Sequence, residues 1–224
     1  MCFSMEMTNK NLLIEGAKAF GIHLDGKAIG AFGLYLKELL KWNQKINLTA
    51  IRSEKGIVLK HYLDSLSVNP CLPQHVSILD IGSGAGFPGI PLKIVRPTFK
   101  ISLIDSVRKK VDFQRHIIRM LGLKGTEAIH GRVQDTEILH SLGGRFDITL
   151  SRAFSDLRTF LVLSFPFLKE GGTAIAMRGE IDHKETHLLA ETEETPYRLK
   201  KAVPLTLPFS NFKRTILLFE KQQV

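Results

Sequence analysis

Short apolar segments alternate with helical segments from residue 76 almost to the end of the chain. Strands are predicted at 76–81, 99–104, 126–130, 145–150, 172–177, 197–203 and 214–219, and helices near 88–95, 107–121, 135–141 and 155–168. Such alternation implies right-handed crossovers and a mostly parallel sheet with helices on both faces. The last two strands have no clear helix between them and are joined by a segment with Pro204, Pro208 and Asn211. This predicts an antiparallel hairpin that closes a seven-stranded α/β sheet.

The first part of the chain, from about residue 9 to residue 66, is predicted to be helical. Apolar residues recur there at the spacing of one helix face, as at Ile29, Phe32, Leu36, Leu39 and Leu40. A length of 224 residues suits one α/β domain with an appendage. We therefore divide the chain at a proline-bracketed turn into an N-terminal helical cap, 1–72, and a second region, 73–224, and expect them to pack as one unit.

Composition excludes several classes of protein. No apolar run approaches the ~20 residues of a membrane-spanning helix, and the start lacks the basic and apolar segments of a secretory signal. Cys2 and Cys71 are the only cysteines, too few for a disulfide framework or a four-ligand zinc site. His183 and His187 stand without the rest of a zinc-protease motif, so we interpret them as a solvated helix face. We expect a cytoplasmic protein with no metal and no membrane contact.

A glycine-rich segment, Asp80–Gly89, follows the first predicted strand directly and opens a helix. Gly82 and Gly84 allow a tight turn and a close approach of backbone to ligand, where a side chain would collide. Gly86 lets the next helix start against the strand, and Pro88 suits the first turn of that helix. The segment predicts a ligand crevice at the carboxyl ends of the strands.

The cofactor is not decided by the glycines alone. The spacing from Gly84 to Gly89 also matches the dinucleotide fingerprint G-x-G-x-x-G, so a nucleotide-dependent oxidoreductase is a rival interpretation. Three features favour S-adenosyl-L-methionine. The glycine register begins at Gly82, Asp80 closes the strand where it can anchor the turn or the ammonium of an amino acid, and Phe87 offers an apolar contact where a pyrophosphate would otherwise sit.

Asp105 ends the second predicted strand and is expected to accept the two ribose hydroxyls of the cofactor. The alternative is a surface carboxylate paired with Arg108 or Lys109. After the third strand, Val133 is expected to pack on the adenine ring. Gln134 or the neighbouring aspartate is expected to accept from the exocyclic amine.

Asp135, the neighbouring aspartate, also suits a helix cap, and this role is compatible with accepting from the adenine amine. The fourth strand ends in Ser151-Arg152-Ala153-Phe154, where donor and acceptor should meet. We expect Arg152 to orient the cofactor carboxylate or the target base, with Ser151 beside it and Phe154 stacking on a base. The alternative for Arg152 is a plain surface cation.

No general base is obvious in the sequence. Cys71 precedes the glycine segment, whereas a nucleophilic cysteine of cytosine methylation would follow the fourth strand, so we assign it no catalytic role. A ring nitrogen with a free lone pair attacks a sulfonium methyl group without losing a proton. Catalysis would then rest on positioning and on exclusion of water. His61 and Asp64 lie one helical turn apart and either pair structurally or help to close the site.

Beyond these residues, the sequence resembles the bacterial 16S ribosomal RNA guanine-N7 methyltransferase family, also called glucose-inhibited division protein B. The resemblance extends from about residue 35 to the end. It is carried by four segments: Leu40–Thr49 (LKWNQKINLT), His61–Ser65 (HYLDS), Asp80–Leu92 (DIGSGAGFPGIPL) and Ser151–Phe154 (SRAF).

The resemblance implies a Rossmann-like class I methyltransferase that methylates N7 of a guanine in the 530 loop of small-subunit rRNA. It implies S-adenosyl-L-methionine as cofactor, S-adenosyl-L-homocysteine as product, and cofactor contacts at Gly82, Phe87, Val133, Gln134 and Arg152. Many members have glutamate where this chain has Gln134, which weakens the expected bond to adenine.

The formal charge of +9 agrees with a polyanionic partner, and basic residues are concentrated between residues 93 and 124. We expect 16S rRNA or the small ribosomal subunit as partner and favour a monomer. Basic residues expected to contact phosphates are those of the Arg108–Arg119 helix together with Lys93, Arg96, Lys37, Lys41 and Lys45; a solvated helix face is the alternative. The remaining rivals are a methyltransferase fold that binds RNA without catalysis and a small-molecule methyltransferase.

Overall fold

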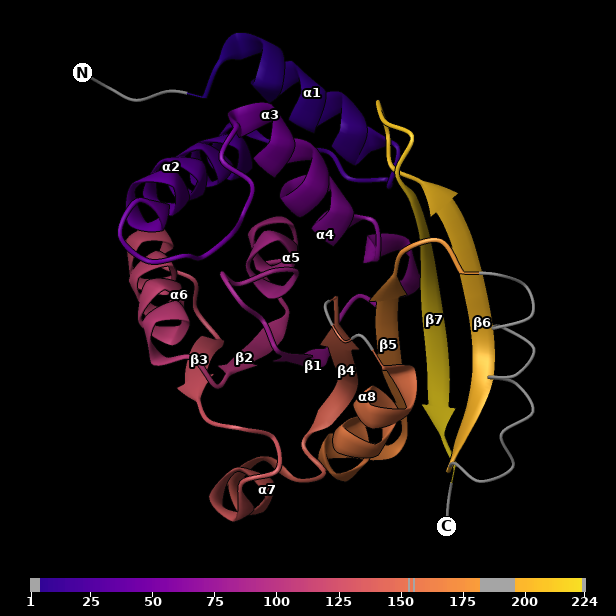
Figure 1. Ribbon diagram of the computed structural model, residues 1–224. Coiled ribbons are helices and arrows are strands. Elements are labelled where there is room, and N and C mark those ends of the chain that lie inside the picture. Colours follow the sequence, from indigo (N-terminus) through magenta and orange to yellow (C-terminus); the bar gives the residue numbers. More distant parts are fainter. Residues whose placement is uncertain (1–4, 153, 155, 182–195, 223–224) are drawn as a thin grey trace.

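The computed structural model describes residues 5–152, 154, 156–181 and 196–222. They form a seven-stranded sheet in the order β3-β2-β1-β4-β5-β7-β6 (Figure 1). The strands are β1 Ser77–Ile81, β2 Lys100–Asp105, β3 Thr126–His130, β4 Phe146–Ser151, β5 Leu168–Arg178, β6 Tyr197–Thr206 and β7 Lys213–Lys221. Strands β1 to β5 are parallel, and β7 pairs antiparallel with both β5 and β6. The predicted sheet and its closing hairpin are confirmed.

Helices cover both faces of the sheet, as predicted (Figure 1). They are α1 Met7–Lys18, α2 Gly26–Asn43, α3 Glu54–Ile57, α4 Asp64–Leu66, α5 Gly89–Val95, α6 Arg108–Leu121, α7 Thr136–Leu142 and α8 Leu157–Ser164. A π-helical turn, η1 (Val58–Leu63), joins α3 to α4. Helices α7 and α8 lie on one face, and the other face carries α5, α6 and the N-terminal helices.

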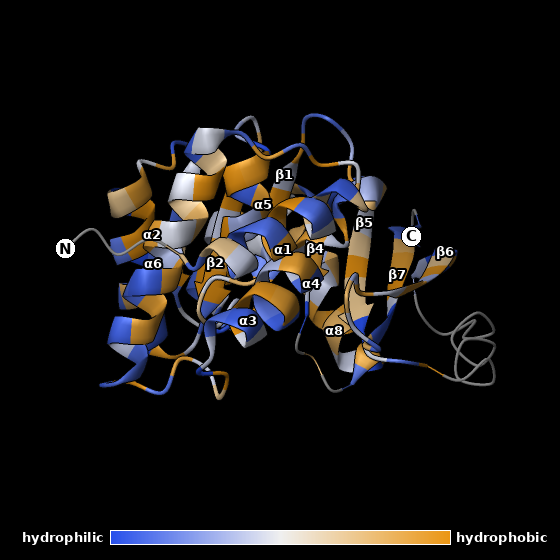
Figure 2. Ribbon diagram, turned by 90° about the horizontal axis from the view of Figure 1, so that it is seen from above, coloured by the Kyte–Doolittle hydropathy of each residue, from blue (hydrophilic) through white to orange (hydrophobic). Residues whose placement is uncertain are grey.

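Alternation along the strands separates two cores. Ile78 of β1 packs into the larger core, which the N-terminal helices share through Phe32 and Tyr62, whereas Leu79 packs toward α8. Individual helix turns combine hydrophilic and hydrophobic residues, as expected for helices with one buried side (Figure 2). The division at residue 72 remains a proposal, and the shared core supports packing as one unit.

Local chemistry explains where the main helices begin and end. The carboxylate of Asp25 accepts from the amide of Ala28 at 2.7 Å and caps α2. Gly122 ends α6 with a φ of 60°, the left-handed conformation usual at this position.

One boundary was predicted wrongly. Helix α8 ends at Ser164, and a 3-10 turn containing Pro166 leads into β5 at Leu168, within the predicted helix. The register on β4 jumps from Leu168 to Thr173, so residues 169–172 form a bulge inside β5. This bulge contains two glycines, which are common where a strand is irregular, and the predicted strand therefore began only at residue 172.

Candidate active site

The glycine loop between β1 and α5 lies at the carboxyl edge of the sheet, as predicted. Gly82, Gly84 and Gly86 have φ values of 70°, 59° and 96°, which side chains other than glycine rarely adopt. The amides of Gly82 and Ser83 donate to the carbonyl of Ile104 at 2.9 and 3.1 Å. The loop is therefore fastened to the end of β2.

Two buried side chains that the sequence did not single out also hold this loop. Gln114 of α6 donates from Nε2 to the hydroxyl of Ser83 at 2.9 Å and to the carbonyl of Gly84 at 2.7 Å. Tyr35 of α2 donates from its hydroxyl to the carbonyl of Ala85 at 2.5 Å. Both contacts arise from helices distant in sequence, so no local signal marks them.

Asp80 anchors the start of α5. Its Oδ2 accepts from the amide of Gly89 at 2.8 Å, and burial raises the pKa of Asp80 to about 7 against the opposing effect of that bond. A Cβ on Gly89 would collide with Leu103 Cδ2 of β2, so Gly89 permits the close packing of helix on strand. The assignment of that packing to Gly86 was wrong, because a Cβ on Gly86 would instead collide with Ile90 Cδ1 of α5 itself.

A pocket of about 220 Å³ opens beside the glycine loop at the carboxyl edge. Asp105 lies in its wall, where Oδ2 accepts from the amide of Gly84 at 2.9 Å and Oδ1 from the amide of Val107 at 2.8 Å. Each carboxylate oxygen keeps a lone pair for a further donor. The bonds of Asp105 thus go to backbone amides and not to Arg108 or Lys109.

The loop after β3 forms the facing part of the pocket. Val133 is buried and Gln134 is exposed, and both line the pocket. Asp135 occupies the position before α7, but its Oδ2 accepts from the amide of Arg132 at 2.8 Å. Asp135 therefore stabilises the turn before α7 and does not cap the first amides of the helix.

Arg152, at the end of β4, is held by the η1 turn of the N-terminal cap. Its Nη1 donates to the carbonyl of Lys60 at 3.0 Å, and its Nη2 donates to Nδ1 of His61 at 2.9 Å. Asp64 Oδ2 lies 3.5 Å from Nη1, and the guanidinium carbon lies 5.1 Å from the centre of the Phe87 ring. Burial lowers the pKa of Arg152, and the negative charge of Asp64 opposes that shift. Arg152 is thus no plain surface cation.

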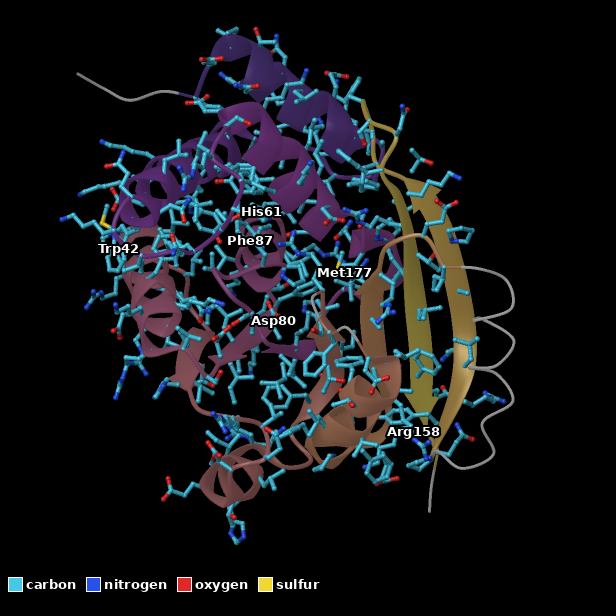
Figure 3. All side chains as sticks on the ribbon, in the orientation of Figure 1. Trp42, His61, Asp80, Phe87, Arg158 and Met177 are labelled. Carbon is cyan, nitrogen blue, oxygen red and sulfur yellow. The ribbon has the colours of Figure 1, made fainter. Side chains whose placement is uncertain are left out.

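His61 is neutral in this arrangement, and its tautomer follows from its partners. Because Arg152 can only donate, Nδ1 accepts and the ring proton lies on Nε2, which donates to Thr49 Oγ1 at 2.7 Å. Burial, and then the charge of Arg152, lower the pKa of His61 to about 3. The ring stacks on Phe87 at 4.4 Å, and Figure 3 shows the two side by side above Asp80. Instead of pairing with each other, His61 and Asp64 both hold Arg152.

Two expected site residues, Phe87 and Ser151, are buried and do not line the pocket. The ring of Phe87 is 5% exposed and stacks between His61 and Tyr35, so it supports Arg152. Ser151 is buried, and its hydroxyl donates to the carbonyl of Ile81 at 2.9 Å.

The pocket therefore gathers only part of the expected set. Lining it are Gly82, Asp105, Val133, Gln134 and Phe154. Outside its lining lie Asp80, Gly84, Gly86, Phe87, Ser151 and Arg152.

The expected phosphate contact of Lys93 was wrong. Its ammonium is buried and donates to the carbonyls of Pro97 and Phe99, and burial lowers its pKa. Cys71 is half-buried with a pKa raised by burial, which does not favour a thiolate. His183 and His187 lie outside the described residues.

The described residues contain neither a metal-ligating cluster nor a helix that could span a membrane. There, no three His, Cys, Asp or Glu residues gather into a group able to hold a metal ion. No helix among those residues has the length and apolar character needed to cross a membrane.

The sequence of this chain is similar to a family of known proteins over most of its length. The family model described as rRNA small subunit methyltransferase G matches residues 29–216. A ribosomal RNA small subunit methyltransferase G from Geotalea uraniireducens (strain Rf4) is 42% identical over 218 residues, covering 97% of this chain and 99% of the relative. The protein of the same name from Acetivibrio thermocellus is 37% identical over 217 residues, covering 96% and 90%.

Solved structures share the fold at low identity. M. jannaschii TYW2 in complex with AdoMet has a TM-score of 0.53 and 18% identity, covering 66% of this chain and 70% of that one. A SAM dependent methyltransferase from Aquifex aeolicus has a TM-score of 0.55 and 17% identity, covering 73% and 92%. The fold is that of Rossmann-like methyltransferases, and on its sequence the chain belongs to the rRNA small subunit methyltransferase G family.

Proposed function

We propose that this protein transfers a methyl group from S-adenosyl-L-methionine to N7 of a guanine in the 530 loop of 16S rRNA. The observation that carries the proposal is the family match over residues 29–216, which makes the chain a small-subunit rRNA methyltransferase. The N7 position and the 530 loop come from the resemblance in the four sequence segments. The proposed substrate is 16S rRNA or the small ribosomal subunit, which would place the activity in the cytoplasm. A monomer is the proposed state.

The pocket fits the nucleoside part of the proposed cofactor. Asp105 presents two carboxylate oxygens with free lone pairs to a ribose, Val133 supplies an apolar surface for a base, and Gln134 supplies an amide at the rim. A Cβ on Gly82 would point toward Phe154 at 3.9 Å, so the glycine keeps the space between them open. S-adenosyl-L-methionine would supply an electrophilic methyl group, leaving S-adenosyl-L-homocysteine as product.

Positioning, not proton transfer, is the proposed task of the protein. Guanine N7 attacks with a lone pair and releases no proton, so no general base is needed. The neutral His61 has its Nδ1 committed to Arg152, which leaves Arg152 fixed at the end of β4. We propose that Arg152 orients the cofactor carboxylate or the guanine, and that Ser151 positions Arg152 by tying the ends of β4 and β1 together.

The ribose role of Asp105 predicts a specific loss of cofactor affinity. Asp105→Ala is expected to weaken S-adenosyl-L-homocysteine binding by about 1–3 kcal/mol, because the hydroxyls would lose a charged acceptor. Calorimetric titration measures this directly. Asp112→Ala, which removes an exposed carboxylate of α6, is the matched control. Affinity unchanged by the Asp105 substitution would place the ribose elsewhere.

Phosphate contacts by the first turn of α6 predict a salt-dependent effect. Lys109 is exposed and Lys110 is half-buried at this helix start. Reversing both charges to glutamate is expected to weaken RNA binding more at low salt than at high salt, and to reduce the salt slope by about 1 for each phosphate that is no longer neutralised. Lys18→Glu on α1 is the control. An equal loss at both salt concentrations would remove these lysines from the interface.

Mapping the modified nucleoside tests the function itself. Ribosomal RNA from cells that lack this protein would be incubated with purified enzyme and methyl-labelled S-adenosyl-L-methionine, then analysed by mass spectrometry. A single 7-methylguanosine in the 530 loop is the expected result. Cofactor binding without label in rRNA or 30S subunits would favour an RNA-binding module without this activity, and binding of NAD(H) alone would favour the oxidoreductase interpretation.

A further inference from the structure

The turn between β6 and β7 holds an exposed aromatic side chain in an unfavourable backbone conformation. Phe209 is 61% exposed and has a φ of 59°, the only positive φ outside glycine among the described residues. A left-handed conformation is unfavourable for an L residue with a bulky side chain, and glycine or asparagine is usual in such turns. Neither the exposure of the Phe209 ring nor its backbone conformation stabilises the isolated protein.

The rest of this turn is well ordered by its own hydrogen bonds. The amide of Leu207 donates to the carbonyl of Phe212 at 2.9 Å. The hydroxyl of Ser210 donates to the carbonyl of Leu207 at 2.9 Å and accepts from the amide of Phe212 at 3.2 Å. The turn therefore presents the Phe209 ring from a fixed frame.

The turn lies at the same edge of the sheet as the active site. Strands β5 and β6 both run antiparallel to β7, so the carboxyl end of β6 shares the edge formed by the ends of β1 and β4. Figure 1 shows the turn reaching toward the N-terminal helices. Lys60 connects the two sites, because its ammonium lies 4.6 Å from the centre of the Phe212 ring and its carbonyl accepts from Arg152.

Three cations lie in or beside this turn. Lys60 and Lys213 are exposed; Lys213 forms a surface ion pair with Glu180 at 2.6 Å that leaves its side chain 60% exposed. Arg214 lies at the base of the turn, where it pairs with Asp64 at 2.8 Å. An exposed ring flanked by cations is the arrangement by which proteins bind single-stranded nucleic acid. Bases stack on the aromatic face, and the cations contact phosphates.

We propose that the β6–β7 turn docks the RNA substrate, with Phe209 stacking on an unpaired base near the target and Lys60 and Lys213 contacting the adjoining phosphates. The inference rests on the proposed function and adds a substrate contact to it. The occupant is RNA, since a single partner of this kind supplies both a base for the exposed ring and phosphates for the exposed lysines beside the turn.

The test separates stacking from folding and from cofactor binding. Phe209→Ala is expected to raise the KM for protein-free 16S rRNA by about 5–150-fold, the usual effect of losing one base–aromatic stack. Phe209→Tyr keeps the ring and is expected to stay within about twofold of wild type. Thermal unfolding and S-adenosyl-L-homocysteine affinity should not fall in either variant. Met7→Ala removes an exposed hydrophobic residue from α1 and is the matched control.

A second readout does not depend on methylation. Single-stranded RNA containing 2-aminopurine loses fluorescence when the base stacks on a ring, and the quenching should disappear with Phe209→Ala and persist with Phe209→Tyr. If wild type methylates no RNA but shows this pattern, the proposed function fails and the docking surface stands. Equal KM and equal quenching for wild type and Phe209→Ala would overturn the inference. A defect seen only with intact 30S subunits would also overturn it, since it would assign the turn to a ribosomal protein.

Discussion

Replacing Arg152 with alanine is expected to lower the rate of methyl transfer by about 100-fold, the scale of loss that misplaced reactants cause. The side chain lies at the end of β4 and is held by the carbonyl of Lys60, by His61 and by Asp64. Three fixed acceptors around one guanidinium leave it a single orientation. A group that orients a reactant must have this property.

A second substitution at Arg152 separates the charge of the side chain from its geometry. Arg152→Lys keeps the charge but cannot donate to Lys60 and His61 in the same fork geometry, so we expect nearly the same loss. Arg145→Ala is the matched control, because Arg145 is exposed and donates to the carbonyl of Ser141 away from the site. Rates would be measured by single-turnover methylation of 16S rRNA, with cofactor affinity determined separately. Activity within about threefold of wild type in Arg152→Ala would remove the residue from the reaction.

Local patterns predicted the elements and the turn that carries the site. The apolar strands and the glycines at 82, 84 and 86 are visible in the sequence because each depends on its immediate neighbours. Asp105 was expected at the pocket because parallel strands end at one edge, and it lies there.

Contacts between segments distant in the sequence could not be predicted, because no local pattern marks them. Tyr35 and Gln114 hold the glycine loop from two separate helices, and Lys93 belongs to a basic stretch but its ammonium turns inward to two carbonyls. Phe87 was expected beside the cofactor because its position in the chain is close to the glycine loop. Its ring packs against His61 of the cap, a partner that no spacing in the sequence could reveal, and its contact with the cofactor stays a prediction.

Asp64→Ala is expected to lower the free energy of unfolding by about 3–5 kcal/mol, because it leaves two partly buried cations without their shared partner. Asp64 is 4% exposed and lies 2.8 Å from Arg214 and 3.5 Å from Arg152. These ion pairs join α4 of the N-terminal cap to β7 and to the end of β4. Urea unfolding measures the loss, and Asp112→Ala, with its exposed carboxylate, should change stability by less than about 0.5 kcal/mol.

A double-mutant cycle identifies the source of that loss. If the uncompensated charge of Arg214 causes it, Asp64→Ala combined with Arg214→Met should cost less than the sum of the two single changes, by about 0.5–3 kcal/mol. Additive losses would instead assign the effect to packing around Asp64. Calorimetry of the same variants tests the proposed single unit. Asp64 links residues 1–72 to residues 73–224 through two arginines. If the shared core holds the two regions together, Asp64→Ala should still unfold in one transition. Two transitions in Asp64→Ala would make these ion pairs the main connection between cap and sheet.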